Sequence, residues 1–305
     1  TGSWYIVQTQ NGEIVRARTR GKMRLQDLDT SNPVAVGDLV NIELDANYEH
    51  TASITEVKHR NNWIIRKANK LSSKRQILAT NLDAAILVAS LFAPRTSLGF
   101  IDRFLVAAEM YHVKPVLVFN KSDLYRAKDL QLFEALRDMY QPLGYPVLLV
   151  SAEKQEGLAE LNTVLKDKTT LLSGHSGVGK SSLLNVLFPG MNRKTQDVSG
   201  WSGKGQHTTT FAEMFDLPPH VFRDGGKIID TPGIRELGLV DISRQELSHY
   251  FPEMKALINN CQFNNCMHTE EPNCAVKNAV NTNEVAAERY ISYRNILDSI
   301  SEKTY

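Results

Sequence analysis

The sequence lacks any apolar run near the roughly 20 residues that a helix needs to cross a bilayer. It also has little excess charge, because 35 Lys and Arg residues face 34 Asp and Glu residues, for a formal net charge of +1. These absences exclude a helical membrane protein and a uniformly basic protein that coats nucleic acid, so any contact with RNA must come from local patches. Cysteine is scarce too, and three unevenly placed cysteines exclude a disulfide scaffold.

A secretory leader is likewise not evident, since the first residues show no basic segment followed by an apolar run and small residues. Together with the few cysteines, this predicts a soluble protein of a reducing compartment, the cytoplasm, with no membrane partner. The sequence does contain 42% hydrophobic and 23% charged residues over 305 positions. Such a composition is typical of a globular protein, and the length predicts two or three domains.

Residues 1–68 carry short runs of β-forming residues separated by turn residues. The expected strands are Trp4–Gln8, Ile14–Arg18, Val36–Leu44 and Ala52–Val57. Several short strands in so compact a segment predict a small β-barrel of the oligonucleotide-binding (OB) type.

Basic residues recur at every second position of this barrel, at Arg16, Arg18, Arg20, Lys22 and Arg24. Strand alternation would place them on one face of a hairpin that turns at Gly21. These basic residues could bind successive phosphates of a nucleic-acid backbone, which would make the face an RNA-binding surface. It could equally be an ordinary solvated strand face, and the hairpin alone does not decide between the two.

Residues 69–238 change to continuous apolar runs, as expected for parallel strands buried on both faces. These runs are Ala84–Ala89, Pro115–Phe119, Pro146–Val150, Thr169–Leu172 and Lys227–Ile229. Helical patterns lie between them, with apolar faces formed by Phe100, Ile101, Phe104, Leu105 and Ala108, and by Leu132, Phe133, Leu136 and Tyr140. The alternation predicts an α/β sheet with helices on both sides, joined to the barrel by a polar, basic linker at residues 68–75.

Residues 239–305 are expected to be helical, with an inserted group of cysteine and histidine residues. From Thr282 onward, apolar residues at Val285, Tyr290, Tyr293, Leu297 and Ile300 predict a closing amphipathic helix.

The strongest single motif is a phosphate-binding loop of the form G-x-x-x-x-G-K-[ST] between an expected strand and an expected helix. Its backbone N–H groups would surround the β-phosphate, while Lys180 would bridge the β- and γ-phosphates and the Ser181 hydroxyl would bind Mg²⁺. The residues expected to contact nucleotide here are Gly174, His175, Ser176, Gly177, Val178, Gly179, Lys180, Ser181 and Ser182.

The base should be guanine, because Asn120, Lys121, Ser122 and Asp123 follow an expected strand. A carboxylate at Asp123 can accept from both N1–H and N2–H of guanine, a donor pair that adenine lacks. The backbone of Ser151 and Ala152, after the next strand, would meet guanine O6, so GTP is favoured over ATP.

One further strand end carries Asp230, Thr231, Pro232 and Gly233. The carboxylate of Asp230 would hold Mg²⁺ through water, and the N–H of Gly233 would meet the γ-phosphate. In GTPases the phosphate loop usually comes first, yet here residues 120–123 and 151–152 precede it. The sheet must therefore be a circular permutant, in which the segment after Gly233 leads directly into the C-terminal domain.

In these motifs and their order the chain resembles the circularly permuted bacterial GTPases called ribosome small subunit-dependent GTPase A, over essentially its whole length. The resemblance implies three domains: an OB-type RNA-binding barrel at 1–68, a permuted GTPase domain at 69–238 and a helical zinc-binding domain at 239–305. It further implies a factor in late maturation of the 30S ribosomal subunit. GTP hydrolysis to GDP would be stimulated by the 30S particle, and the barrel and zinc module would contact 16S rRNA. We expect a monomer.

Hydrolysis needs a group that orients the attacking water, and Ile234 occupies the position where many GTPases have a glutamine. The segment Gly205–Thr210 lies where the first switch is expected, and one threonine among Thr208, Thr209 and Thr210 would bind Mg²⁺. His207 is our candidate for positioning the water, and the resemblance supports it, while a solvated loop histidine is the alternative.

All the cysteines fall in Cys261-x4-Cys266-x-His268-x5-Cys274. Thiolates and imidazole are the ligands of tetrahedral Zn²⁺, and a Cys₃His set closes the site to water, so one structural zinc is predicted. Buried free thiols beside a surface histidine would be the alternative.

Two other functions compete with a GTPase regulated by an RNA particle. A GTP-gated RNA-binding module, in which hydrolysis only ends the binding cycle, fits the same motifs. A metabolic ATPase or kinase is disfavoured by Asp123.

Overall fold

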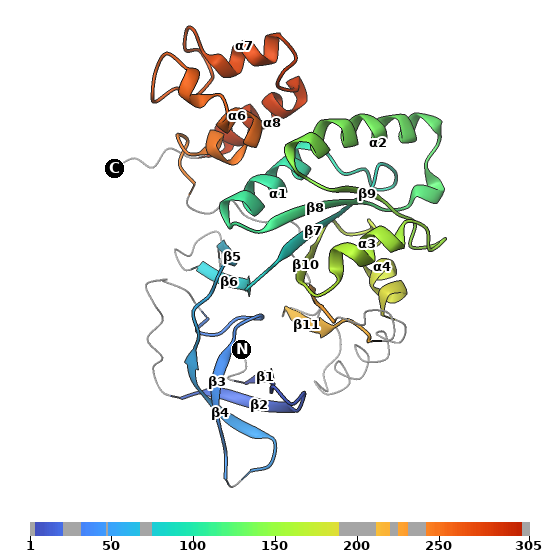
Figure 1. The fold of residues 1–305 in the computed structure, drawn as a ribbon, viewed down its shortest axis with the longest axis vertical. Coiled ribbons are helices and arrows are strands. Elements are labelled where there is room, and N and C mark those ends of the chain that lie inside the picture. The colour runs from blue at the N-terminus through green and yellow to red at the C-terminus, as the bar shows by residue number, and fades with distance from the viewer. Residues whose placement is uncertain are drawn as a thin grey trace. The chain divides into compact units, whose positions relative to one another are not determined.

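A computed structural model of the chain describes residues 4–20, 32–46, 48–67, 75–188, 212–219, 225–230 and 242–300. The chain divides into two compact units, residues 1–81 and residues 82–305 (Figure 1).

The first unit contains a four-stranded sheet in the order β1-β2-β4-β3, blue in Figure 1. Its strands are β1 (Tyr5–Gln8), β2 (Ile14–Thr19), β3 (Val40–Leu44) and β4 (Thr51–Val57). Neighbouring strands pair antiparallel except β2 and β4, which pair parallel. The strands predicted for this region are confirmed, although β3 begins later than expected because Gly37, at φ 94°, makes a turn before it.

Alternation along β2 exposes Arg16 and Arg18 and buries Val15 and Ala17. Arg20, directly after the strand, is also exposed and pairs with Glu43. The expected basic face therefore exists over this part of the chain, while Lys22 and Arg24 lie outside the described residues. The buried side holds a small apolar core of Val15, Ala17, Val34, Ala52 and Ile54.

Two strands that the sequence did not predict complete this unit. Strand β5 (Trp63–Lys67) pairs antiparallel with β6 (Arg75–Thr80). The unit consequently runs to Asn81, and the boundary expected at residue 68 falls between two paired strands.

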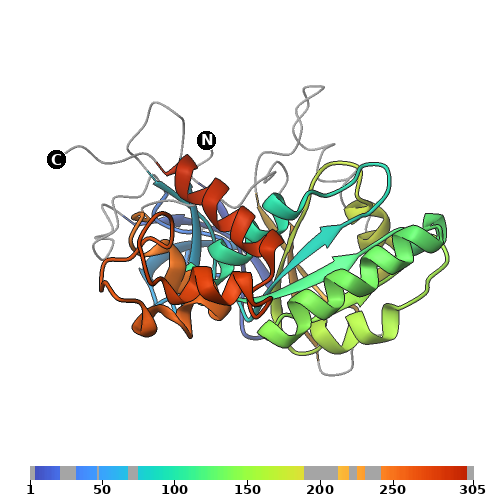
Figure 2. The same cartoon turned by 90° about the horizontal axis from the view of Figure 1, so that it is seen from above.

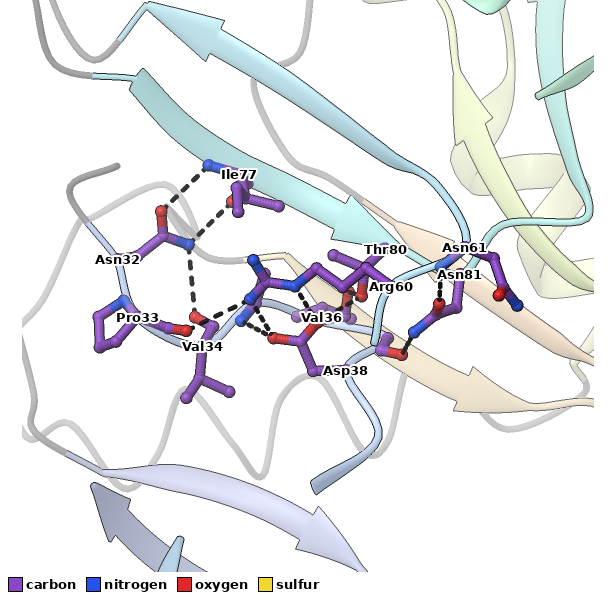
Figure 3. A network of polar contacts seen from close by, with 12 residues as sticks. Asn32, Pro33, Val34, Val36, Asp38, Arg60, Asn61, Ile77, Thr80 and Asn81 are labelled. Carbon is purple, nitrogen blue, oxygen red and sulfur yellow. Dashed lines mark hydrogen bonds and ion pairs between the residues drawn. The ribbon is translucent and has the colours of Figure 1, made fainter. Parts of the chain in front are cut away.

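A polar network fixes the turn before β3 against β6 (Figure 3). The carboxylate of Asp38, 1% exposed, accepts from Arg60 Nε at 2.7 Å and Nη2 at 2.6 Å, and from Thr80 Oγ1 at 2.8 Å. Asn32 pairs with both backbone groups of Ile77, donating to its carbonyl and accepting from its N–H at 3.0 Å each. Buried polar groups are costly when unpaired, so this network specifies one arrangement of the turn.

The second unit is built on a six-stranded sheet in the order β11-β12-β10-β7-β8-β9. Its parallel strands are β7 (Ala84–Ala89), β8 (Lys114–Phe119), β9 (Val147–Leu149), β10 (Thr169–Ser173) and β12 (Lys227–Asp230). Strand β11 (Glu213–Asp216) adds an antiparallel edge. The sequence predicted each parallel strand to within two residues at either end, and β11 was not predicted.

Helices cover both faces of this sheet, as predicted (Figures 1 and 2). Helices α1 (Leu98–Met110) and α2 (Ala127–Tyr140) lie on one face, and α3 (Leu158–Leu165) and α4 (Lys180–Leu187) lie on the other. Their buried sides include the expected Ile101, Phe104, Leu105, Phe133 and Leu136. Short 3₁₀ turns occur at Ser122–Leu124 and Gln141–Leu143.

The C-terminal helices belong to this same unit, and α8 (Ala287–Ser299) packs on α1. They are α6 (Pro252–Lys255), α7 (Ala275–Asn281) and α8, with 3₁₀ turns at Leu247–Tyr250 and Ile258–Asn260. One apolar cluster joins Val106 of α1 to residues of α7 and α8. The closing helix begins at Ala287 rather than near Thr282, because Thr282 is the C-terminal cap of α7. Among the described residues, no helix is long and apolar enough to cross a membrane.

Candidate nucleotide site and Cys/His cluster

The polar motifs of the second unit meet at one edge of its sheet. Parallel strands place their carboxyl ends on the same side, and ligands of open α/β sheets bind there. Phe119 ends β8 before the Asn120–Asp123 loop, Ser173 ends β10 before the phosphate loop, and Asp230 ends β12. Segments that are separated in sequence are therefore neighbours in space, although their order along the chain is permuted.

The phosphate loop, residues 174–181, has glycine at two positions where a side chain would not fit. A Cβ on Gly174, at φ 145°, would lie 2.3 Å from the Val88 carbonyl oxygen. A Cβ on Gly179, at φ 92°, would lie 2.3 Å from Asn120 Nδ2. The loop thus fits between β7 and the Asn120–Asp123 loop only because both positions lack a Cβ. Helix α4 begins directly after Gly179, so its N-terminal N–H groups face the loop.

Lys180 is positioned by earlier residues of the phosphate loop. Its Nζ donates to the carbonyl oxygens of Gly174 at 2.6 Å and His175 at 2.7 Å. Burial lowers the pKa of Lys180 below its usual range, and the charge of Asp230 opposes that shift. The ammonium is therefore poorly hydrated, and a bound phosphate would supply the charge compensation that water cannot. Ser181 and Ser182 follow in the first turn of α4.

The side chain of Asn120, 1% exposed, ties two loops together. Its Nδ2 donates to the Val178 carbonyl oxygen at 3.0 Å, and its Oδ1 accepts from the Ala152 N–H at 3.1 Å. Asn120 thereby links the Asn120–Asp123 loop to the phosphate loop and to the segment after β9.

Asp123 is exposed at the same edge, and its Oδ1 accepts from Ser151 Oγ at 2.6 Å. That contact fixes the orientation of the carboxylate while leaving acceptor capacity for a ligand. Lys121, in a left-handed conformation at φ 68°, extends its Nζ to the Ala93 carbonyl oxygen at 2.7 Å. The N–H of Ser122 donates to the Val150 carbonyl oxygen at 3.1 Å, which connects this loop to the segment after β9.

Tyr125, which no sequence motif indicated, supports this arrangement. Tyr125 OH donates to the Asn120 carbonyl oxygen at 2.8 Å and accepts from the Leu91 N–H at 2.9 Å. It therefore connects the Asn120–Asp123 loop to the loop after β7. The only available signal was its position two residues after Asp123, in a segment that resembles any polar turn.

Asp230 lies opposite Glu213 in the register of β12 and β11. Burial raises the pKa of Glu213, and the Asp230 charge raises it further. Gly233 and the switch candidates His207, Thr208, Thr209 and Thr210 lie outside the described residues.

The Cys/His cluster, defined as Cys261, Cys266, His268 and Cys274, is assembled as the spacing predicted. Its ligand atoms all lie within 4.8 Å of one another. His268 Nδ1 lies 3.6 Å from Cys261 Sγ and 3.3 Å from Cys274 Sγ, and the two sulfurs are 4.0 Å apart. A zinc tetrahedron with ordinary bond lengths has edges of about 3.5–3.8 Å, so the donor set fits that ion.

The surroundings of the cluster also suit a cation. Burial raises the pKa of Cys266 to about 12 and also raises that of Cys274, because a buried site disfavours the charged thiolate form. Burial lowers the pKa of His268, which keeps its imidazole neutral. A divalent cation would stabilise the deprotonated thiols, and a neutral imidazole is the form that binds metal.

Comparisons with known proteins agree with this geometry. A family model described as RsgA GTPase matches residues 57–240, and one described as RsgA N-terminal domain matches residues 1–51. The fold and site thus define a circularly permuted GTPase, an enzyme that hydrolyses GTP. Within that class, the chain belongs to the RsgA GTPase family.

Its relatives match over nearly their whole lengths. A "Small ribosomal subunit biogenesis GTPase RsgA" of Bacteroides fragilis (strain YCH46) is 46% identical, covering 100% of this chain and 96% of the relative. The protein of that name from Cytophaga hutchinsonii is 47% identical, and the match covers 97% of this chain and 95% of the relative. Among solved structures, YjeQ from Thermotoga maritima has a TM-score of 0.77 at 36% identity, covering 97% of this chain and 94% of that one. YloQ, titled a circularly permuted GTPase, has a TM-score of 0.73 at 30% identity, and the match covers 100% of this chain and 93% of that one.

Proposed function

We propose that this GTPase acts in late maturation of the small ribosomal subunit, as a cytoplasmic monomer. It hydrolyses GTP to GDP and phosphate, and the 30S particle stimulates that hydrolysis. The curated relatives carry the name of small-subunit biogenesis GTPases at 46% and 47% identity, which supports the assignment.

The proposal that GTP is the nucleotide rests on the contact between Asp123 and Ser151. Ser151 Oγ lies 2.6 Å from Asp123 Oδ1, at the edge of the sheet where the phosphate loop also lies. An oriented carboxylate accepts from N1–H and N2–H of guanine, and adenine has no such donor pair. Ser151 and the nearby Ala152, whose N–H donates to Asn120 Oδ1, would meet guanine O6 through their backbone.

The phosphates would lie on the N–H groups of residues 174–181, with Lys180 across the β- and γ-phosphates. Mg²⁺ would be held by the Ser181 hydroxyl at the start of α4, by one of Thr208, Thr209 and Thr210, and through water by Asp230. Oxygen donors of this kind suit the ion, which neutralises charge that develops on the phosphates. The N–H of Gly233 would meet the γ-phosphate, and His207 would position the attacking water.

One zinc ion would occupy the Cys/His cluster. With three thiolates and one imidazole, no position stays open for water, so the ion stabilises the loop between Cys261 and Cys274 and takes no part in hydrolysis.

The outer face of the first unit supplies a candidate rRNA contact. Trp4 and Ile6 are exposed beside Arg16 and Arg18, and the Arg18 guanidinium lies 4.8 Å from the centre of the Trp4 ring. Aromatic rings and guanidinium groups stack on unpaired bases, while positive charge attracts the phosphate backbone. The proposal is that this face and the C-terminal helices bind 16S rRNA.

The test is GTP turnover with and without purified 30S particles. The proposal predicts slow intrinsic turnover that rises steeply with 30S concentration, while an equal amount of 50S particles has no such effect. Unchanged turnover, with tight GTP-dependent binding to 30S, would instead support a GTP-gated RNA-binding module.

A further inference from the structure

Helix α1 contacts the phosphate loop and the C-terminal helices at once. Near its start, the Phe100 ring packs on the His175 ring of the phosphate loop, with centroids 3.7 Å apart. Two residues later, Asp102 Oδ1 accepts from Arg289 Nη1 of α8 at 2.6 Å. Successive side chains of a helix point about 100° apart, so these two residues engage opposite sides of the same first turns.

The backbone of His175 is linked to the ammonium group of Lys180, which is expected to contact phosphate. The His175 carbonyl oxygen accepts from Lys180 Nζ, and a second N–H of that ammonium goes to Gly174. An ammonium has three donors, which leaves one for a phosphate. A phosphate on Lys180 and on the loop N–H groups therefore orders the backbone at His175, and with it the ring against Phe100.

The contact between α1 and α8 is a buried charge network. Arg289, 1% exposed, donates to Glu253 through Nε at 2.7 Å and Nη2 at 3.1 Å, besides its bond to Asp102. Tyr140 OH of α2 donates to the same Asp102 oxygen at 2.8 Å, and the guanidinium lies 4.6 Å from the centre of the Phe251 ring. Sliding α8 along α1 would leave buried charges unpaired, which is strongly unfavourable, so the two helices are held in one register.

The residues next to Arg289 on α8 hold the Cys/His cluster. Tyr290 OH donates to the His268 carbonyl oxygen at 2.6 Å, and Tyr293 OH donates to the Met267 carbonyl oxygen at 2.8 Å. An ordered loop around His268 thus has its backbone fixed to the helix that carries Arg289.

We propose that α1 and α8 couple the phosphate loop to the Cys/His cluster, with Arg289 as the positioning residue, so that guanine nucleotide and zinc each strengthen the binding of the other. The coupling arises because each ligand orders one end of a connected pair of helices and reduces the ordering that the second ligand must impose. The inference rests on the proposed function only in assuming that guanine nucleotide and zinc occupy these sites.

The test measures the rate at which a chromophoric chelator removes zinc from the full chain, with and without saturating GDP. Parent protein is compared with Phe100→Ala, which cuts the connection at the phosphate loop, and with Phe100→Tyr, which keeps the ring. Ile291→Ala is the matched control, since Ile291 is exposed on α8 between the coupling residues. GDP affinity is measured on zinc-loaded and zinc-depleted protein as the reciprocal quantity.

The proposal predicts that GDP slows zinc removal by at least about fivefold in the parent, in Phe100→Tyr and in Ile291→Ala, and that the factor falls to about one in Phe100→Ala. Zinc should tighten GDP binding by a matching factor. If GDP binds the parent and zinc is present, but removal is equally fast with and without GDP, the coupling is refuted while the proposed function stands. An unchanged factor in Phe100→Ala would refute α1 as the route. Failure of GDP to bind at all would refute the nucleotide site and the coupling together.

Discussion

The amide of Asn120 donates a hydrogen bond to the carbonyl oxygen of Val178, across 58 positions of sequence. This bond joins the loop that would recognise the base to the loop that would hold the phosphates. The paired strands β8, β7 and β10 bring the two loops to the same edge of the sheet, and this bond connects them directly.

Replacing Asn120 should therefore weaken nucleotide binding without unfolding the sheet. Asn120→Ala loses the bonds to Val178 and Ala152, and at about 0.5–1.5 kcal/mol each the GDP dissociation constant should rise about 5- to 150-fold. Asn120→Asp keeps an acceptor for the Ala152 N–H but not the donor to Val178. Calorimetric titration that finds Asn120→Asp as tight as the parent would show that the Val178 bond is dispensable.

His207 should affect catalysis far more than binding. A residue that positions the attacking water contributes only in the transition state, so His207→Ala should lower kcat by at least about 100-fold and leave GTP affinity within about twofold. His112→Ala is the control, because His112 is an exposed histidine in the turn after α1. Single-turnover hydrolysis and nucleotide binding are measured on both variants, and equal turnover in His207→Ala would contradict the assignment.

The Cys/His cluster should bind zinc more tightly as pH rises. Burial raises the pKa values of Cys266 and Cys274, so both thiols are protonated in the metal-free protein at neutral pH. Zinc must then displace protons, and its apparent affinity should increase from about pH 6.5 to about pH 8.5. Competition with a chromophoric chelator over this range measures the effect.

Metal content provides the control for that experiment. Parent protein should contain about one zinc per chain, His249→Ala should match it because His249 lies outside the cluster, and Cys274→Ser should lose most of it. Parent protein purified without chelator but free of zinc would contradict the site.

Two ion pairs of the first unit should differ sharply in their contribution to stability. Asp38 and Arg60 are buried and linked by two hydrogen bonds, so Asp38→Asn should lower the free energy of unfolding of this unit by about 3–5 kcal/mol. Arg20 and Glu43 are exposed, so Glu43→Gln should cost less than about 1 kcal/mol. Denaturant unfolding compares these matched variants, and equal losses would contradict the network of Figure 3 as a structural anchor.

The sequence predicted the parallel sheet closely because each of its central strands is apolar on both faces. Ala84–Ala89 is predicted and observed with the same ends, and every residue in it is buried. Strands β5 and β6 were not predicted because the polar, basic residues 68–75 between them indicate a linker, although Arg75 begins β6 and Ile64 and Ile77 are buried. β11 is four residues long and half exposed, too short for a periodicity to be recognised.

The residues of the site likewise fall into those that the sequence predicts and those that only the structure shows. Motif residues such as Gly179 and Asp123 are recognisable because local backbone geometry and ligand chemistry require those residue types. The supporting contacts are not: Asp102 and Arg289 are 187 positions apart, and nothing in the sequence around a helical arginine indicates that it is 1% exposed. Partners of this kind are set by how helices pack, so only the structure shows them.

Selection of guanine by Asp123 is tested most directly by the affinity of the parent and of Asp123→Asn for GDP, ADP and XDP. We expect the parent to bind GDP far more tightly than ADP or XDP. An amide can donate to the 2-oxygen of xanthine where the carboxylate accepted from guanine N2–H, so Asp123→Asn should prefer XDP. A parent that binds ADP as tightly as GDP, or an Asp123→Asn variant that keeps the parent's preference for GDP, would contradict this selection.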